Sequence, residues 1–389
     1  MKKSHNSLAV YIHWPFCKSI CPYCDFNSHI EKKINQLRWE RALLKEVQYF
    51  YEKTKTHTVK TIFFGGGTPS LMPPILVNNI IDAIKKLWRT SKKLEITLEA
   101  NPMGFDISRF EEFRDVGINR LSLGIQSLND NSLRFLGRQH TRSDALIAIN
   151  AGKKIFNQCS IDMIYALPNQ TKNSWKKELD EIISISGNHL SLYQLTIEPG
   201  TPFFKNRTSP ATELTAIQLY RQTRKTAIAS GFLHYEVSSF ARLGHKSKHN
   251  LTYWRGGEYI GIGPGAHGRL LEKKTTIATH QIHNPDNWLQ AVEKRGIGLA
   301  KARSLGATER IEELFLLGLR ITEGINRARF KQQTGHALDR VIDQKILNEL
   351  INSKYLEANE TSLRATEKGR LCINAITASI VSKKTDLIN

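Results

Sequence analysis

Cysteine is scarce in this chain, and its distribution argues against a disulfide framework. The 389 residues include five cysteines, and three of these fall within eight positions near the N-terminus. A small secreted protein would distribute paired cysteines along its chain, so we expect a reducing compartment. The other two, Cys159 and Cys372, stand alone, and each is expected to be a small buried apolar residue.

Long apolar runs are also missing. No stretch approaches the roughly 18 apolar residues of a membrane span. The charged start Met1-Lys2-Lys3 is followed by a segment that His13 and Pro15 interrupt, and not by the apolar core of a signal peptide. We find no internal repeat and no low-complexity segment. With 40% hydrophobic residues, the composition is typical of a globular protein, which we expect in the cytoplasm.

Acidic residues are too few to balance the basic ones. The chain has 56 lysines and arginines against 36 aspartates and glutamates, a net charge of +20. The lysines are scattered in short clusters such as Lys32-Lys33, without the dense basic stripe and interleaved aromatics of a nucleic-acid platform. We therefore expect a solvated basic surface and no specific nucleic-acid partner. Attraction to an anionic membrane surface, at its inner face, is the next interpretation.

What the sequence does contain is an alternation of strand-like and helix-like segments. Apolar runs predict strands at residues 8–12, 60–64, 94–99, 120–125, 160–165, 190–197 and 235–240. Helical patterns between them, such as residues 31–51 and 74–88, indicate βαβ units with parallel strands. Six or seven such units in about 240 residues favour a barrel or partial barrel over an open sheet.

The pattern changes after about residue 300. Two helices, a short hairpin and a last helix are predicted, at residues 309–320, 338–352, 355–364 and 367–379. This order resembles a winged-helix-like module that is mainly helical. We therefore expect two domains: residues 1–300, which include all the motifs described below, and residues 301–389.

Cys17, Cys21 and Cys24 form a C-x₃-C-x₂-C motif directly after the first predicted strand. Three thiolates on one loop can bind three irons of a [4Fe–4S] cluster and leave the fourth without a protein ligand. An open iron is what the amino and carboxylate groups of S-adenosylmethionine (SAM) require. An electron passed to the SAM sulfonium would then break a C–S bond and give a 5′-deoxyadenosyl radical. The alternative is a zinc site with His29 as the fourth ligand, but nothing marks a self-standing zinc module.

The cysteine motif is followed by Gly65-Gly66-Gly67-Thr68-Pro69-Ser70 and by Glu99-Ala100-Asn101-Pro102. In this order the motifs resemble the radical-SAM superfamily. More narrowly, nearly the whole chain is similar to the branch that contains oxygen-independent coproporphyrinogen III oxidase and the heme chaperone HemW. The resemblance implies an α/β fold, a partial (β/α) TIM-like barrel that holds a [4Fe–4S] cluster and SAM, followed by the C-terminal module.

The resemblance also implies which residues contact SAM. Matched to the family pattern, the SAM-binding set is Tyr11, Gly66, Gly67, Thr68, Glu99, Gln126, Arg138 and Asp162. The glycines would let the backbone approach the methionine amino group, and Arg138 would suit the SAM carboxylate. Glu99 would lie near the ammonium or ribose, and Asp162 near the ribose hydroxyls. Taken singly, each has an ordinary structural alternative, such as a capping carboxylate or a turn residue.

Two features separate the oxidase from the chaperone. In the oxidase a fourth cysteine follows the third after one residue, and Phe26 stands there in this chain. The segment His249-Asn250-Leu251-Thr252-Tyr253-Trp254 is similar to the H-N-x-x-Y-W motif associated with heme binding in the chaperone branch. The resemblance therefore implies heme as a third cofactor, bound through His249. The alternative is a buried histidine packed against aromatic rings.

The expected function is a heme chaperone that delivers heme to respiratory heme proteins at the membrane. No residue is assigned a catalytic role. Two alternatives from other classes stay open. One is coproporphyrinogen III decarboxylation, for which a basic protein would suit a substrate with four carboxylates. The other is a radical-SAM enzyme acting on nucleic acid, prompted by the positive charge and the winged-helix-like tail.

Overall fold

The computed structural model describes residues 6–103, 106–273 and 275–381. One large sheet dominates it, with the strand order β14-β13-β12-β11-β1-β4-β5-β6-β7-β8-β10-β9. The parallel strands are β1 (Ser7–Trp14), β4 (Thr58–Gly66), β5 (Arg89–Ala100), β6 (Arg120–Gln126), β7 (Gln158–Tyr165), β8 (His189–Gln194) and β11 (Glu258–Ile262). The edge strands β14 and β9 are not paired with each other, so the barrel is partial, as expected.

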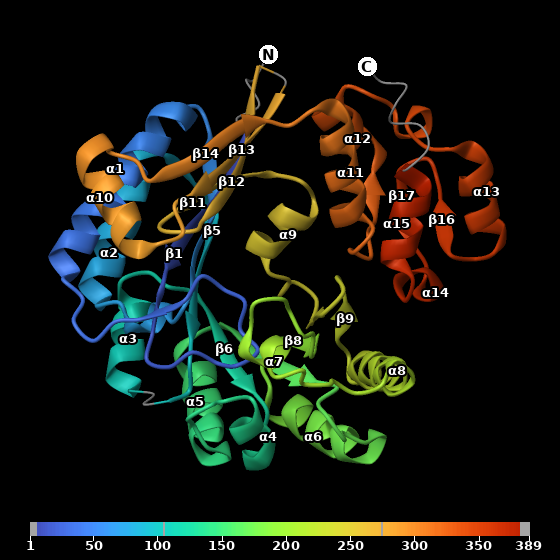
Figure 1. Cartoon of the computed structure of the whole chain (residues 1–389), viewed down its shortest axis with the longest axis horizontal. Coiled ribbons are helices and arrows are strands. Elements are labelled where there is room, and N and C mark those ends of the chain that lie inside the picture. The colour runs from blue at the N-terminus through green and yellow to red at the C-terminus, as the bar shows by residue number, and fades with distance from the viewer. Residues whose placement is uncertain (1–5, 104–105, 274, 382–389) are drawn as a thin grey trace.

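Helices cover the outer face of this sheet (Figure 1). They are α1 (Gln36–Thr54), α2 (Pro74–Leu87), α3 (Ile107–Asp115), α4 (Asp130–Phe135), α5 (Arg142–Ile155), α6 (Lys172–Ile185), α8 (Glu213–Ala229) and α10 (Pro285–Arg295). Side-chain caps fix their starts: Thr141 and Thr171 form capping boxes before α5 and α6. The helix expected from residue 31 begins only at Gln36, because the Asn35 side chain accepts a hydrogen bond from the Arg38 N–H and caps it.

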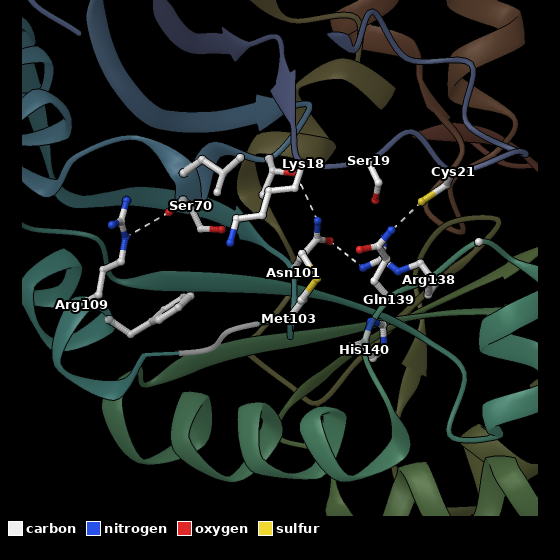
Figure 2. A pocket seen from close by; sticks show the side chains of 14 residues that line it. Lys18, Ser19, Cys21, Ser70, Asn101, Met103, Arg109, Arg138, Gln139 and His140 are labelled. Carbon is white, nitrogen blue, oxygen red and sulfur yellow. Dashed lines mark hydrogen bonds between the residues drawn. The ribbon is translucent and has the colours of Figure 1, made fainter. Parts of the chain in front are cut away.

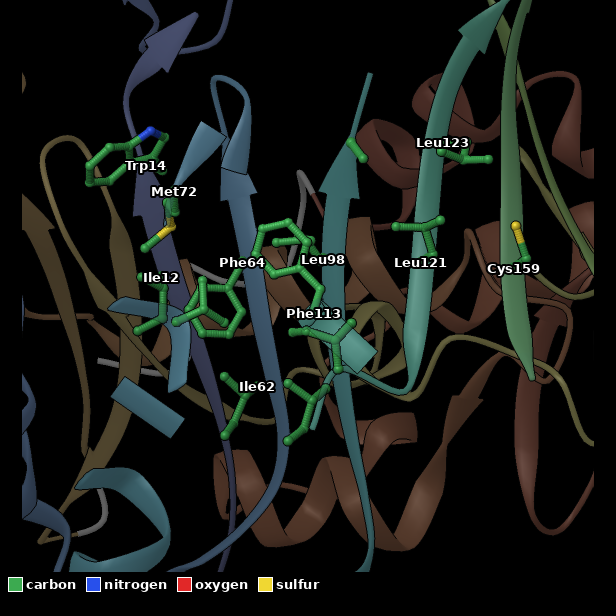
Figure 3. Packing of buried hydrophobic residues seen from close by; sticks show 14 of the residues in the cluster. Ile12, Trp14, Ile62, Phe64, Met72, Leu98, Phe113, Leu121, Leu123 and Cys159 are labelled. Atoms are coloured by element: carbon green, nitrogen blue, oxygen red, sulfur yellow. The ribbon is translucent and has the colours of Figure 1, made fainter. Parts of the chain in front are cut away.

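The main core lies between these helices and the sheet. Ile12, Ile62, Phe64 and Leu98 project from adjacent strands onto one buried face, as Figure 3 shows. Near-continuous apolar runs of this kind are typical of parallel strands that are covered on both faces. Cys159 belongs to this core, as predicted, with 4% of its surface exposed. Cys372 is exposed, so the expectation that it is buried is wrong.

The sheet differs from the prediction at both ends, where pairing is antiparallel. The strand expected at residues 235–240 is replaced by β9 (Leu233–His234) and β10 (Ser239–Ala241), which pair antiparallel to each other. An antiparallel meander of β12 (His267–Glu272), β13 (Thr275–Gln281) and β14 (Leu299–Ser304) extends the other end. These strands carry mostly polar and charged residues, so their apolar pattern was too weak to predict them.

The C-terminal elements form a second core of their own. They are α11 (Ala307–Gly318), β15 (Ile325–Asn326), α12 (Arg327–Thr334), α13 (Gln344–Asn352), β16 (Leu356–Ala358), β17 (Ser362–Ala365), α14 (Glu367–Arg370) and α15 (Ile373–Val381). The expected hairpin is β16–β17, and β15 adds a third strand to it. Helix α9 (Lys248–Trp254) lies between the two parts, and Arg310 donates a hydrogen bond to the Gly256 carbonyl just after it. None of the described helices is long and apolar enough to cross a membrane.

Candidate cluster and cofactor site

Cys17 ends β2 (Phe16–Cys17), and Cys21 and Cys24 lie on the loop from there to β3 (His29–Ile30), at the carboxyl ends of the parallel strands. The three cysteines line a cavity of about 330 Å³, large enough for a small ligand. Most of the predicted site residues line the same cavity: Cys17, Cys21, Cys24, Gly66, Gly67, Thr68, Glu99, Gln126, Arg138 and Asp162. The fold thus gathers residues from the cysteine loop, from the ends of β4, β5 and β6, and from within β7, near the carboxyl ends where barrel folds place their chemistry.

A chain of hydrogen bonds joins two of the cysteines through the cavity wall. The Thr68 hydroxyl donates to Cys17 Sγ over 3.3 Å, and Arg138 Nη1 donates to Cys21 Sγ over 3.6 Å. Asn101 connects these two side chains, since its Nδ2 donates to Thr68 Oγ1 at 3.1 Å and its Oδ1 accepts from Arg138 at 2.6 Å. Figure 2 shows Arg138 held between Asn101 and Cys21. These hydrogen bonds position the thiols of Cys17 and Cys21 and the guanidinium of Arg138.

Asn101 is a site residue that the sequence reasoning did not assign. It lines the cavity, and its amide orients Arg138. The available signal was its place in the segment Glu99-Ala100-Asn101-Pro102, directly after the end of β5. Tyr193, at the end of β8, was missed for a similar reason: it lines the cavity but belongs to no quoted motif.

The environment of the thiols bears on metal binding. Burial raises the pKa of Cys17 and of Cys24, while hydrogen bonds, such as that from Thr68 to Cys17, partly offset this. Iron would have to displace the thiol protons, since the thiolate is the ligand. His29, the fourth ligand of the zinc alternative, does not line the cavity, and its Nε2 is hydrogen-bonded to Asn27 Oδ1 at 2.9 Å. It is therefore not gathered with the cysteines.

Two half-buried carboxylates, Glu99 and Asp162, line the cavity. Burial raises the pKa of Glu99 to about 8, and the Asp162 carboxylate adds to the rise. Glu99 accepts one long hydrogen bond, from the Gly66 N–H at 3.3 Å. Burial also raises the pKa of Asp162, which accepts hydrogen bonds from Ser122 at 2.8 Å and Ser160 at 3.3 Å.

These carboxylates fit SAM, which carries a sulfonium and an ammonium. A buried carboxylate with few partners is destabilised in its charged form, and a cation bound beside it removes that penalty. Glu99 would face the positive groups, Asp162 would accept from the ribose hydroxyls, and Arg138 would donate to the SAM carboxylate. When bound, the cluster supplies one electron and SAM supplies the sulfonium that accepts it.

Gly66 and Gly67 have a local reason to be glycine besides approach to a ligand. Gly66 has φ +116°, and a Cβ there would lie 2.6 Å from the His13 ring. A Cβ on Gly67 would lie 2.8 Å from the Phe16 carbonyl oxygen. The Gly67 N–H also donates to the Trp14 carbonyl at 2.7 Å. The glycine segment is therefore packed directly against the strand that leads into the cysteine loop.

Tyr11 lies outside the residues that line the cavity. Its hydroxyl is hydrogen-bonded to His13 Nδ1 at 3.1 Å, and its ring packs on Phe63 with 6.1 Å between centroids. Burial raises the pKa of this phenol well above its usual value. The side chain thus lies one layer below the cavity, under the glycine segment, since a Cβ on Gly65 would meet the Tyr11 ring at 2.8 Å.

His249, the expected heme ligand, is also outside the cavity and is 1% exposed. Its Nδ1 pairs with Thr61 Oγ1 at 2.8 Å and its Nε2 with the Tyr253 hydroxyl at 2.7 Å. The ring stacks on Phe63, with 4.8 Å between centroids, and burial lowers its pKa to about 3. Both ring nitrogens have partners, so in this conformation neither can reach a heme iron.

Large apolar side chains stand at the mouth of the cavity, among exposed polar ones such as Asp25 and Gln194. Ile20, Phe26 and Tyr193 all line it and are 43%, 64% and 43% exposed. Phe26 stands where the oxidase pattern has its fourth cysteine, so the substitution replaces a thiol with an exposed ring at the edge of the site. Large exposed apolar side chains grouped at one mouth are typical of a surface that contacts a ligand or partner.

Comparison with known proteins identifies the family of the chain. The model of the radical SAM superfamily matches residues 11–182, and that of the HemN C-terminal domain matches residues 305–372. The fold is similar to that of coproporphyrinogen III oxidase (HemN) from Escherichia coli, with a TM-score of 0.81, 21% identity, and coverage of 96% of this chain and 90% of that one.

The sequence matches extend over nearly the whole chain. Heme chaperone HemW is 35% identical over 379 residues in Haemophilus influenzae and 34% identical over 375 in Escherichia coli; each match covers 95% of this chain and at least 96% of the relative. Radical S-adenosyl methionine domain-containing protein 1, mitochondrial, from Danio rerio is 36% identical over 96% of this chain and 86% of its own length. The chain therefore belongs to the radical-SAM superfamily, within the family of these relatives, and this membership implies a [4Fe–4S] cluster and SAM as its cofactors.

Proposed function

We propose that this protein is a heme chaperone that binds heme and delivers it to respiratory heme proteins, with the cluster and SAM as cofactors. The observation that carries the proposal is the end-to-end similarity to proteins named heme chaperone HemW, at 34–35% identity over 95% of the chain. The similarity to the oxidase structure, at 21% identity, supports the fold alone.

The cavity supports this choice over the oxidase. Phe26 replaces the cysteine of the oxidase pattern and is 64% exposed at the cavity mouth, beside Ile20 and Tyr193. A porphyrin presents a broad apolar face, and aromatic and aliphatic side chains at a mouth suit such a ligand. Within the cavity, Cys17, Cys21 and Cys24 would hold the cluster.

The positive charge of the protein fits delivery of heme to acceptor proteins that lie in a membrane. A net charge of +20 would draw the protein to the anionic inner face of a membrane, where respiratory heme proteins lie. We propose this peripheral location as part of the function.

The test is an anaerobic reconstitution with iron and sulfide, followed by titration with hemin. The proposal expects a broad cluster absorbance, together with a Soret band that saturates near one heme per chain. In parallel, the same protein is incubated with SAM, a reductant and coproporphyrinogen III. Conversion to protoporphyrinogen without stoichiometric heme binding would overturn the proposal in favour of the oxidase.

A further inference from the structure

The inner face of the sheet, opposite the main core, carries aromatic and hydrogen-bonding side chains below the cavity. Ile12 and Phe64 point into the main core, so their neighbours along β1 and β4 point to the other face, into the barrel. Tyr11 and Phe63 are two of these neighbours, and they are paired in register across the two strands. The glycine segment (residues 65–67) follows Phe63 along β4 and ends at the cavity. The inner face is therefore built in layers, as barrel interiors are.

Two rings support the glycine segment from the layer beneath it. A Cβ on Gly65 would lie 2.8 Å from the Tyr11 ring and 2.9 Å from the Phe63 ring, so the backbone at Gly65 rests directly on both. The two rings also stack on each other, with 6.1 Å between centroids. The next residue, Gly66, lines the cavity and donates its N–H to Glu99 at 3.3 Å. The backbone that faces the cavity thus depends on where the two rings lie.

His249 occupies the layer below these rings. Its imidazole stacks on Phe63, with 4.8 Å between centroids, and its centroid lies 6.4 Å from that of Tyr11. Hydrogen bonds fix the imidazole from two sides, through Thr61 Oγ1 at 2.8 Å and the Tyr253 hydroxyl at 2.7 Å. A buried ring with both nitrogens bonded keeps one orientation, so His249 holds the two rings above it in place.

The helix that carries His249 and Tyr253 is held between the barrel and the C-terminal module. Helix α9 packs on β4 and β11 on one side and on α11 on the other (Figure 1). Just after α9, the Gly256 carbonyl accepts hydrogen bonds from Arg310 at 2.6 Å and from Gln333 at 2.7 Å. The C-terminal module therefore helps to keep both side chains inside the barrel.

We propose that His249 and Tyr253 are positioning residues of the SAM site, which hold Tyr11 and Phe63 beneath the glycine segment. A binding site needs its contacting groups kept within about 0.5 Å of their working positions, and packed, hydrogen-bonded side chains behind them provide this. The inference goes beyond the proposed function, because it gives the H-N-x-x-Y-W segment a role that requires no contact with heme. It rests on the assignment of the cavity to SAM.

The test measures the SAM affinity of reconstituted full-length variants by equilibrium dialysis, together with EPR of the reduced cluster with and without SAM. His249→Ala removes the ring beneath Phe63. It should weaken SAM binding by about tenfold or more, as loss of a group that orients ligand contacts does, and alter the EPR change that SAM causes. Tyr253→Phe removes only the hydroxyl bonded to His249, so SAM binding should weaken by about threefold with the fold intact. Circular dichroism and iron content verify folding.

His234→Ala is the matched control. The His234 ring is also buried and stacks on a phenylalanine, Phe240, with 4.5 Å between centroids. It lies in the edge strand β9, away from the glycine segment. This variant should lose stability, as His249→Ala does, and keep the wild-type SAM affinity and EPR signal. An equal loss of SAM affinity in the two variants would reduce the effect of His249 to general destabilisation and overturn the inference.

The remaining outcomes separate the inference from the function. Wild-type SAM affinity in both His249→Ala and Tyr253→Phe would overturn the inference. Loss of hemin binding by His249→Ala at wild-type SAM affinity would also overturn it and make His249 a heme ligand. Absence of hemin binding by the wild-type protein would overturn the proposed function and leave this inference standing.

Discussion

At the scale of single residues, a buried glutamate organises the region where the meander meets the barrel. Glu46, in α1, is fully buried and accepts three hydrogen bonds: from Gly263 N–H at 2.9 Å, Gly298 N–H at 2.7 Å and Trp288 Nε1 at 3.1 Å. Its carboxylate joins the end of β11, helix α10 and the start of β14. A shorter apolar side chain at this position would leave the three buried donors without their acceptor.

We predict that Glu46→Ala lowers the free energy of unfolding by about 3 kcal/mol or more, because each buried donor left unpaired costs about 1–3 kcal/mol. Chemical denaturation followed by circular dichroism measures the effect. Glu52→Ala is the matched control: it lies on the same helix, is half exposed and pairs with Lys55 at 2.6 Å. The control should be indistinguishable from the wild type, and equal effects in the two variants would contradict the role given to Glu46.

Glu99 gives a pH prediction for SAM binding. Because burial and Asp162 raise its pKa to about 8, most of this carboxyl is protonated at neutral pH before a cation binds. A cationic ligand favours the ionised form, so binding must release a proton below that pKa. The SAM affinity of the reconstituted protein should therefore increase by up to about tenfold between about pH 6.5 and 7.5. Equilibrium dialysis at several pH values measures it.

Glu99→Gln is the control for this prediction. The amide has nearly the same shape and does not titrate, so SAM should bind more weakly and this part of the pH dependence should vanish. Any pH dependence from the SAM amino group itself stays in both proteins. Parallel pH profiles of wild type and variant would show that Glu99 does not face the positive groups of SAM.

Single residues also show which contacts of the site could not be predicted from the sequence. The cysteine spacing and the glycine and acidic motifs point to one site, and the fold gathers ten of those residues around one cavity. The sequence could not reveal Asn101 as the connection between Thr68 and Arg138, because that contact depends on three separate segments. Nor could it reveal that both nitrogens of His249 are bonded inside the fold, which depends on Thr61 in a distant strand.

At the scale of elements, the parallel strands and their helices were predictable and the antiparallel ones were not. Buried parallel strands are apolar along their whole length, so β1, β4 and β7 are conspicuous in the sequence. In β14 nearly every side chain is exposed, so no apolar pattern marks it. The strand expected at residues 235–240 fails because Glu236 and Ser238 form a turn, in which the Ser238 N–H donates to the Glu236 carboxylate.

The cysteine loop depends on a close contact with another element. Gly137, just after α4, has φ +67°, and a Cβ there would lie 2.4 Å from Cδ of Pro22, between two of the cysteines. We predict that Gly137→Ala displaces the loop and lowers the iron bound after reconstitution several-fold, while the chain still folds. Iron and sulfide analysis measures the occupancy, and circular dichroism verifies the fold.

Gly200→Ala is the control that separates backbone strain from the contact. Gly200 also has a positive φ, +88°, but no atom lies within 4 Å of the position of its Cβ. Both substitutions should cost about 1–2 kcal/mol of backbone energy, because a Cβ in the left-handed conformation lies too close to a carbonyl oxygen. Iron loss in Gly200→Ala equal to that in Gly137→Ala would mean that the Pro22 contact does not position the loop.

At the scale of the whole molecule, the excess of positive charge distinguishes the surface. With a net charge of +20, the protein should bind vesicles that contain anionic phospholipid and ignore neutral ones. Attraction of this kind is screened within about 10 Å at 0.1 M salt, so binding should weaken steeply between low and high ionic strength. Vesicle co-sedimentation measures both effects. Equal binding to neutral vesicles, or binding that survives about 1 M salt, would contradict a purely electrostatic docking.

In the proposed function, the partial barrel holds a cluster and SAM, and the protein also carries a heme. The most direct test of that account is heme transfer. The reconstituted protein is loaded with hemin, separated from free heme, and mixed anaerobically with membranes from heme-starved cells that hold respiratory apoproteins. We expect heme to leave the protein and to appear as the respiratory heme signal faster than free hemin supplies it. Heme that stays on the protein, or transfer no faster than from free hemin, would contradict it.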